Sequence, residues 1–213
     1  MMEVEQIEKK TLRVAVLVSG SGSNLQALID AREQEQLPGV ELALVVCNRA
    51  EAQGLQRALN ARIPAVYLPW KQRVEAERKL ASLIELFQID LIVLAGWMRI
   101  FTPEFSSQFP RRIINLHPAL LPDSGQGNTY TTSNGTVIPV FRGLHVVEAA
   151  LAAGISVTGS TVHYVIPEVD AGPAISHAEV AILPDDTADN LHERIKQAEH
   201  GLIVEAVRQY RLK

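Results

Sequence analysis

Residues Ile113–Pro122 read IINLHPALLP, a short apolar run that ends in an Asn, a His and a proline-containing turn. Side chains two residues apart on a strand point to the same face, so Asn115 and His117 should lie side by side. Pro118 disfavours helical backbone in the residue before it, which keeps His117 extended or in a turn. An amide donor beside an imidazole suits a reaction in which an oxyanion forms and a proton moves. In isolation the pattern is more typical of a turn-capping Asn and a polar His at the edge of a core, so only partners elsewhere in the chain favour the catalytic interpretation.

Other apolar runs precede this stretch at Val14–Val18, Val40–Cys47 and Asp90–Ala95, with helical patterns between them. Strands that are apolar on both faces and alternate with helices are typical of parallel sheets covered on both sides. The sequence therefore predicts an α/β fold, in which a mostly parallel twisted sheet carries helices on both faces.

The helices and the remaining strands follow from periodicity. A charged amphipathic helix is predicted over Lys71–Phe87, with inward-facing apolar side chains at Val74, Leu80, Leu83, Ile84 and Phe87. Further strands are predicted at Ser156–Val165 and Pro173–Leu183, a helix over Gly143–Ala153 that closes at Gly154, and a last helix from a cap at Thr187 to about Leu212. Between them, Asp123–Phe141 is rich in Gly, Ser, Thr and Asn, and its Asn134-Gly135 pair predicts a protruding hairpin or a mobile flap.

Composition bounds the class of protein. The chain has 213 residues, 47% hydrophobic residues and a net charge of −4, which predicts one domain over residues 12–213 and argues against a nucleic-acid surface. A single cysteine, Cys47, rules out an intramolecular disulfide and a thiolate metal cluster, as expected for a reducing cytosol. Residues 1–11 lack the apolar core of a signal peptide and are expected to form a flexible tail. No apolar run reaches membrane-spanning length.

In parallel sheets, ligands bind beyond the carboxyl ends of the strands, which is where Gly20–Asn24, Gly96–Ile100 and Asn115–His117 all fall. The first of these loops is not a dinucleotide fingerprint, because Leu25 stands where the last glycine is required, and it has no lysine to make a triphosphate loop. What remains is an anion-binding turn at a helix N-terminus, sized for one terminal phosphate, or a plain glycine turn.

Four stretches in the same order resemble the phosphoribosylglycinamide formyltransferase family: Ser19–Leu28 (SGSGSNLQAL), Leu94–Ile100 (LAGWMRI), Asn115–Pro122 (NLHPALLP) and Gly159–Pro173. The resemblance spans Leu12–Leu212 and implies a Rossmann-like formyltransferase fold. It also implies transfer of a formyl group from 10-formyltetrahydrofolate to the glycinamide amine of 5'-phosphoribosylglycinamide, in de novo purine biosynthesis. The expected enzyme is cytoplasmic, acts on small molecules as a monomer or homodimer, and needs no metal, nucleic acid or membrane.

The resemblance also implies residue roles. Asp170, in the Asp-x-Gly-Pro motif, is expected beside His117, where its carboxylate would raise the pKa of the imidazole. Asn115 and protonated His117 would then stabilise the oxyanion, while Asp170 assists proton transfer. The implied ribonucleotide and phosphate contacts are Gly22, Ser23, Asn24, Lys196, Gln197, Ala198 and Glu199. The implied folate contacts are Arg73, Met98, Arg99, Ile100, Phe101, Asn115, Ile166, Pro167, Glu168, Val169 and Asp170. Arg73 is equally well interpreted as a solvated helix charge. His163, His177, His192 and His200 are expected to be structural or surface residues.

The chain departs from the family pattern in the segment after Pro122, where Asp123–Phe141 adds roughly 15–20 residues to a short connection. Arg142 stands where the family has a proline, and Val147 where it often has a second histidine. Three rivals remain: a formyltetrahydrofolate hydrolase, which uses a similar Asn, His and Asp but a His-His variant and an extra N-terminal domain; methionyl-tRNA formyltransferase, which adds a C-terminal domain; and a non-catalytic folate- or phosphate-binding protein.

Overall fold

The computed structural model describes residues 10–212, so the predicted tail lies almost wholly outside the described residues. A seven-stranded sheet forms the centre, in the order β3-β2-β1-β4-β5-β8-β9. Its strands are β1 (Leu12–Val18), β2 (Val40–Cys47), β3 (Ala65–Tyr67), β4 (Leu91–Leu94), β5 (Ile113–His117), β8 (Val157–Tyr164) and β9 (Ala174–Ala181). The helices are α1 (Ser23–Glu33), α2 (Gln53–Asn60), α3 (Arg73–Leu86), α4 (Pro103–Gln108), α5 (Val146–Ala152) and α6 (Ala188–Leu212).

Strand pairing confirms the mostly parallel sheet. The pairs among β1 to β5 are all parallel, whereas β8 pairs antiparallel with both β5 and β9. In the register, Leu17 pairs with Leu94 and Leu94 with Asn115, so β1, β4 and β5 end at the same level. The loop after β1 contacts the loop after β4 directly, because Ser19 N donates to Gly96 O at 3.1 Å. The predicted ligand loops therefore meet at one edge of the sheet.

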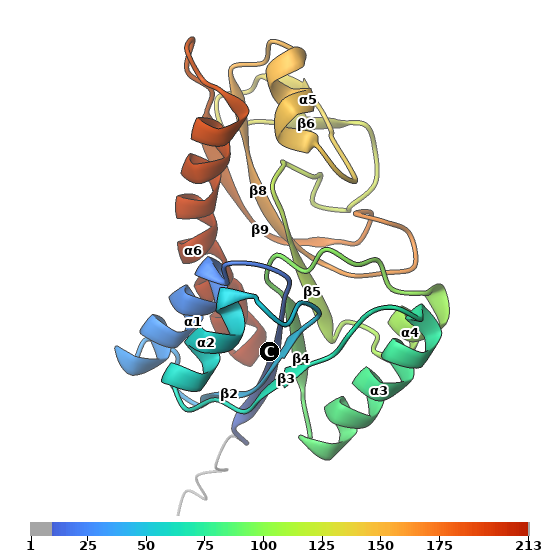
Figure 1. Ribbon diagram of the computed structural model, residues 1–213. Helices are drawn as coiled ribbons and strands as arrows, with labels where there is room; N and C mark the ends of the chain where they lie inside the picture. Colours follow the sequence, from blue (N-terminus) through green and yellow to red (C-terminus); the bar gives the residue numbers. More distant parts are fainter. Residues whose placement is uncertain (1–9, 213) are drawn as a thin grey trace, which may run out of the picture.

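Helices cover both faces of the sheet, as predicted (Figure 1). On one face, α1, α2 and α6 bury Leu25, Leu28 and Ile203 against β1 and β2, and on the other face α3 buries Leu80 and Ile84. Burying each such leucine or isoleucine contributes about 1.5–3 kcal/mol. These two apolar layers hold the sheet rigid beneath the loops at its carboxyl edge.

The inward position predicted for Val74 in α3 is wrong, because its side chain is 73% exposed. The buried residues of α3 are Ala76, Glu77, Leu80 and Ile84. At about 100° per residue, Val74 lies roughly 120° around the helix from Leu80. The helix therefore buries the carboxylate of Glu77, which accepts hydrogen bonds from Thr102 N and Oγ1 at 2.7 Å each, rather than Val74.

Helix α4 was not predicted, although its capping residues carry the signal. Thr102 Oγ1 accepts a hydrogen bond from Phe105 N at 3.1 Å, and Pro103 occupies the first turn. The helix predicted from Gly143 begins at Val146 instead, because Gly143 and His145 have φ values of 79° and 59°. Its predicted end is confirmed, since Gly154 is left-handed at φ 63°. The cap at Thr187 is also confirmed, because its Oγ1 accepts from Asn190 N at 3.2 Å.

The segment between β5 and α5 contains the predicted hairpin, formed by β6 (Thr129–Thr131) and β7 (Val137–Pro139). Gly135 supplies the left-handed residue of its turn, at φ 86°. The hairpin is tied to β9, because Ser133 N and Oγ both donate to the carboxylate of Glu179, at 2.6 and 2.7 Å. The hairpin therefore packs on the antiparallel part of the sheet.

Candidate active site

Asn115 and His117 lie at the carboxyl end of β5, and the His117 side chain is buried. His117 points both of its ring nitrogens at polar atoms. Nε2 lies 2.8 Å from Phe141 O, and Nδ1 lies 3.5 Å from Asp170 Oδ2. A carbonyl oxygen can only accept, so the short contact places a proton on Nε2.

Asp170 reaches this site from the connection between β8 and β9. Its carboxylate is held by Gly143 N, which donates to Oδ2 at 2.9 Å, and its Oδ1 lies 3.5 Å from His163 Nε2. The structure therefore brings Asp170 to Asn115 and His117, although it lies more than fifty residues after both of them in the sequence. Asp170 adopts φ 50°, the left-handed region that Asp tolerates better than most residues.

His163 is a site residue that sequence reasoning assigned only to a structural or surface role. It is buried on β8 directly opposite Asn115, and its Nδ1 lies 2.9 Å from Tyr164 O. A carbonyl oxygen can only accept, so Nδ1 is the donor in that contact, and Nε2 is the nitrogen that can accept from Asn115 Nδ2 at 3.2 Å. His163 thereby fixes which way the Asn115 amide points. A histidine inside a predicted buried strand, where an unpartnered ring nitrogen is costly, was the available signal.

The pKa values contradict one expectation. Burial lowers the pKa of His117 below its ordinary value, and the charge of Asp170 and the Phe141 carbonyl offset this only in part. The carboxylate of Asp170 acts in the predicted direction, but the expected net rise is wrong, because desolvation of the buried imidazole outweighs a carboxylate 3.5 Å away. For Asp170, burial acts to raise the pKa, but the interaction with the His163 ring, the charge of His117 and the Gly143 N–H lower it overall. At neutral pH the pair is an ionised Asp170 and a neutral His117.

The glycine loop after β1 packs so closely on α2 that its last glycine has no room for a side chain. A Cβ on Gly22 would lie 2.8 Å from the Cα of Gly54, and Gly22 is left-handed at φ 71°. Helix α1 begins at the next residue, Ser23, so the N–H groups of its first turn are directed to the carboxyl edge of the sheet. Such a terminus attracts an anion.

A chain of buried polar groups joins this loop to β5. Asn24 Nδ2 donates to Glu199 Oε2 at 2.8 Å, and Ser160 Oγ lies 3.2 Å from Glu199 Oε1 and 2.9 Å from His117 O. The Oδ1 of Asn24 is buried and has no hydrogen-bond partner among the described residues. Buried hydrogen bonds therefore link the start of α1 to the main chain of His117.

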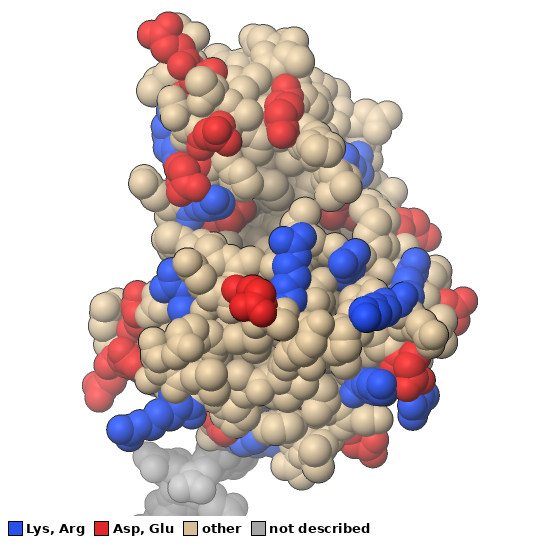
Figure 2. Space-filling model, viewed as in Figure 1, with Lys and Arg blue, Asp and Glu red and all other residues tan. Residues whose placement is uncertain are grey.

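Figure 2 shows a hollow across the middle of one face, between the part that carries α5 and the part that carries α2 and α3. Several Lys and Arg side chains stand along its lower side. In the chain, Arg49, Lys71, Arg73 and Arg99 follow the carboxyl ends of β2, β3 and β4, and all four are exposed. Local positive charge of this kind can meet an anionic ligand although the chain as a whole is acidic.

The sequence profile of the formyl transferase family matches residues 12–207. The phosphoribosylglycinamide formyltransferase of Haemophilus influenzae is 37% identical over 193 residues, which cover 89% of this chain and 82% of the relative. The chain belongs to the formyl transferase family. Among solved structures, glycinamide ribonucleotide transformylase 1 from Symbiobacterium toebii matches this formyl transferase with a TM-score of 0.82 and 36% identity, over 94% of this chain and 88% of that one.

Longer relatives also contain this unit. The human trifunctional purine biosynthetic protein adenosine-3 is 39% identical over 203 residues, which cover 94% of this chain but 18% of that protein. The chain thus spans about a fifth of the length of that relative. The resemblance to the phosphoribosylglycinamide formyltransferases that the four motifs indicated is confirmed.

Not all predicted ribonucleotide residues of this formyl transferase come together. Glu199 faces Asn24, whereas Lys196 Nζ donates to Glu193 at 2.6 Å on the exposed side of α6. Gln197 is exposed, and Ala198 packs in a separate apolar cluster with α5. The helical period separates them, because consecutive residues on a helix face different directions.

The predicted folate segments are also divided. Met98 and Ile100 are 57% and 60% exposed, and Val169 is exposed on the loop that ends at Asp170. Phe101 is buried in an aromatic cluster with Trp70 and Phe105, so its ring belongs to the core. Exposed apolar side chains on these two loops suit a flat apolar ligand.

Arg73 begins α3, and its Nε lies 3.4 Å from the Glu77 carboxylate, with 45% of the side chain exposed. It is thus a partly exposed helix cation that already has an acidic partner. Within residues 10–212, no group of three or more His, Cys, Asp and Glu side chains is arranged to hold a metal ion. The helices of this same part of the chain are too short or too polar to cross a membrane.

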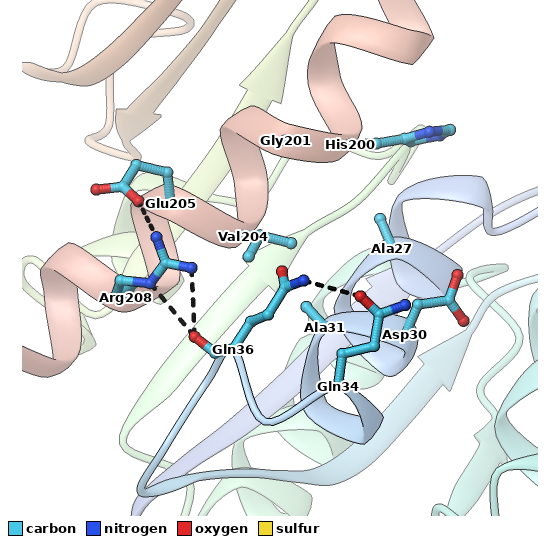
Figure 3. Close-up of a pocket in the computed structure, with 10 residues that line it drawn as sticks. All are labelled: Ala27, Asp30, Ala31, Gln34, Gln36, His200, Gly201, Val204, Glu205 and Arg208. Atoms are coloured by element: carbon cyan, nitrogen blue, oxygen red, sulfur yellow. Dashed lines mark hydrogen bonds and ion pairs between the residues drawn. The ribbon is translucent and has the colours of Figure 1, made fainter.

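A separate pocket of about 320 Å³ lies between α1 and α6 (Figure 3). It is lined by small residues, among them Ala27, Ala31 and Gly201, and by the longer side chains of Gln36 and Arg208. Arg208 is bonded to Glu205 at 2.5 Å and to Gln36 O at 3.3 Å. Asn115, His117 and Asp170 do not line this pocket, so it lies apart from the candidate active site.

Proposed function

We propose that this chain transfers the formyl group of 10-formyltetrahydrofolate to the glycinamide amine of 5'-phosphoribosylglycinamide in de novo purine biosynthesis. The observation that carries the proposal is one arrangement at the carboxyl edge of the sheet. The Asn115 amide and the protonated Nε2 of His117 lie on one strand, and Asp170 is 3.5 Å from His117. The anion-attracting start of α1 is joined to them through Glu199 and Ser160.

In the proposed reaction, the amine attacks the formyl carbon and the carbonyl electron pair moves to oxygen. Asn115 Nδ2 and His117 Nε2–H donate hydrogen bonds to that oxyanion, so neutral His117 acts as a donor rather than as an imidazolium. Losing one such donor typically costs about 3 kcal/mol of transition-state stabilisation. For His117 to donate to the substrate, its Nε2–H has to leave Phe141 O, which it contacts in this structure.

The tetrahedral intermediate collapses when the bond between carbon and the folate nitrogen breaks. The attacking amine then has a proton too many, and the leaving nitrogen needs one. Ionised Asp170 can accept the first proton and return it to the leaving nitrogen, directly or through water. The low pKa of Asp170 keeps the carboxylate available for this step at neutral pH.

Substrate placement follows the loops around this centre. Gly22, Ser23 and Asn24 would hold the ribonucleotide phosphate with Glu199 beside them, and Met98 to Ile100 and Ile166 to Asp170 would line the folate. Five predicted contact residues are not assigned to either substrate here. On α6, Lys196 pairs with Glu193, and Gln197 and Ala198 lie on other sides of the helix from Glu199. Arg73 pairs with Glu77, and Phe101 is buried in the core.

The proposal extends to the setting of the enzyme. It acts in the cytoplasm on two small molecules, as a single domain over residues 12–213 and as a monomer or homodimer, without nucleic acid or a membrane. 10-Formyltetrahydrofolate is a co-substrate that is consumed in each turnover rather than a resident cofactor.

The test is an assay of 10-formyltetrahydrofolate consumption with and without 5'-phosphoribosylglycinamide, in which the formylated ribonucleotide is measured as well. Consumption that requires the ribonucleotide, with equal amounts of folate consumed and formylated product made, is expected. Equal consumption without the ribonucleotide would identify a hydrolase instead, and binding without turnover would identify a binding protein.

A further inference from the structure

Arg142 places its guanidinium where three backbone carbonyls meet. Its Nε donates to Asp170 O at 3.0 Å, and its Nη2 donates to Gly125 O and Gly127 O at 2.9 Å each. One acceptor belongs to the loop between β8 and β9, and the other two belong to the segment before β6. A single side chain thus joins the loop of Asp170 to the segment that follows β5.

The neighbours of Arg142 in the chain contact the same pair of site residues. Phe141 O accepts from His117 Nε2 at 2.8 Å, and Gly143 N donates to Asp170 Oδ2 at 2.9 Å. We call residues 141–143 the strap. The strap therefore touches the imidazole, the carboxylate and the backbone of Asp170 through three consecutive residues.

The loop of Asp170 needs such support. Asp170 has φ 50°, a backbone conformation that is unfavourable for a residue with a side chain. A packed contact holds the same loop, because a Cβ on Gly125 would lie 2.2 Å from Ala171 O. The backbone of Asp170 is thus fixed by contacts with the segment after β5, and its carboxylate position follows from that backbone.

We propose that Arg142 is a positioning residue, which holds the Asp170 loop so that the carboxylate faces His117, and which acts through Asp170 rather than on a substrate. The inference rests on the proposed function, in which Asp170 moves a proton. Lysine cannot replace Arg142, since a single ammonium cannot reproduce a planar fork with donors aimed at separate carbonyls.

Three charged or titratable groups face the His117 imidazole: Asp170 from the β8–β9 loop, His163 from β8, and Arg142 from the strap. Asp170 raises the pKa of His117, whereas Arg142 and His163 lower it. Arg142→Lys keeps the positive charge but removes the fork. If the fork positions Asp170, the lysine variant loses the contribution of Asp170 and the pKa of His117 falls.

The experiment compares wild type, Arg142→Lys and Arg142→Met in the formyl transfer assay. Misplacing a catalytic group by about 1 Å can cost up to about 100-fold in rate, so both variants should lose about 10- to 100-fold in kcat. Their KM for the ribonucleotide should stay within about twofold, because the phosphate loop is untouched. Arg78→Met is the matched control, since Arg78 is an exposed arginine on α3 that pairs with Glu75, and it should keep the wild-type kcat.

The second measurement is an NMR titration of the histidine-labelled chain, in which the resonance missing from His117→Asn identifies His117. In Arg142→Lys the pKa of His117 should be lower than in wild type. A wild-type kcat in both variants, or an unchanged or raised pKa in Arg142→Lys, would overturn the positioning role. Absence of ribonucleotide-dependent transfer in wild type would instead refute the proposed function, while the titration would still test where Arg142 places Asp170.

Discussion

Replacing Glu199 by alanine should lower the free energy of unfolding much more than replacing it by glutamine. Its carboxylate is buried, accepts from Asn24 Nδ2 at 2.8 Å and lies 3.2 Å from Ser160 Oγ. The Ser160 hydroxyl has one hydrogen, which is shared between Glu199 Oε1 and His117 O, 2.9 Å away. In Glu199→Gln, the amide oxygen can still accept from Asn24, and the amide nitrogen can donate to Ser160, which then gives its hydrogen to His117 O.

The magnitudes follow from this count of donors and acceptors. Glu199→Ala removes a hydrogen bond to a charged group and leaves the Asn24 amide buried without a partner, together a loss of about 3 kcal/mol. For a chain of this length that corresponds to a fall in melting temperature of roughly 6–12 °C. Glu199→Gln keeps every bond, so its free energy of unfolding should lie within about 1 kcal/mol of wild type.

Urea unfolding followed by the fluorescence of Trp70 and Trp97 measures both variants. Ser160→Ala is a useful companion, because it removes the shared hydroxyl without touching the contact between Asn24 and Glu199. A Glu199→Gln variant as unstable as Glu199→Ala would show that the negative charge itself, and not the pattern of donors and acceptors, stabilises this link, and would refute the reasoning.

Two further predictions concern pH and packing. Because burial lowers the pKa of His117 below 6.5 in the folded chain, the free energy of unfolding should be highest above pH 6.5 and should fall as the pH drops through the folded-state pKa. Asp170, whose pKa lies below 3.8, adds its own loss only at lower pH. When the free energy of unfolding is measured with urea between pH 5 and 8, it should depend less steeply on pH in His117→Asn than in wild type. The same pH dependence in both would contradict the lowered pKa of His117. On α3, Val74→Lys should change stability by less than about 0.5 kcal/mol, while Leu80→Ala should cost about 2–5 kcal/mol; similar losses in thermal unfolding would contradict the observed inward face.

Much of the sheet and its carboxyl edge could be predicted, because β1, β2 and β4 contain the apolar runs Val14–Val18, Leu42–Cys47 and Leu91–Leu94, and each run is followed by a loop with a polar residue or a glycine. The meeting of Asn115 with Asp170 was predicted only through the family resemblance. Nothing in local sequence relates two residues that are joined by the antiparallel return of β8 against β5.

The features that the sequence did not predict depend on three-dimensional contacts. His163 orients Asn115 only because the register of β5 and β8 places them opposite each other. The direction of the His117 pKa shift depends on how completely the imidazole is buried, which no spacing of residues reveals. Val74 is apolar but lies on another side of α3 from Leu80 and Ile84. The buried face includes Glu77, a charged residue that a pattern of apolar residues does not predict to be buried.

The central claim is that an ionised carboxylate beside the imidazole moves the proton in formyl transfer. Asp170→Asn tests it most directly, because asparagine has the same shape, tolerates the left-handed backbone at φ 50° and can still accept from Gly143 N. With both substrates saturating, the single-turnover rate of formyl transfer should fall by about 10²–10⁴-fold while the urea midpoint stays near that of wild type. A wild-type rate in Asp170→Asn would contradict the account.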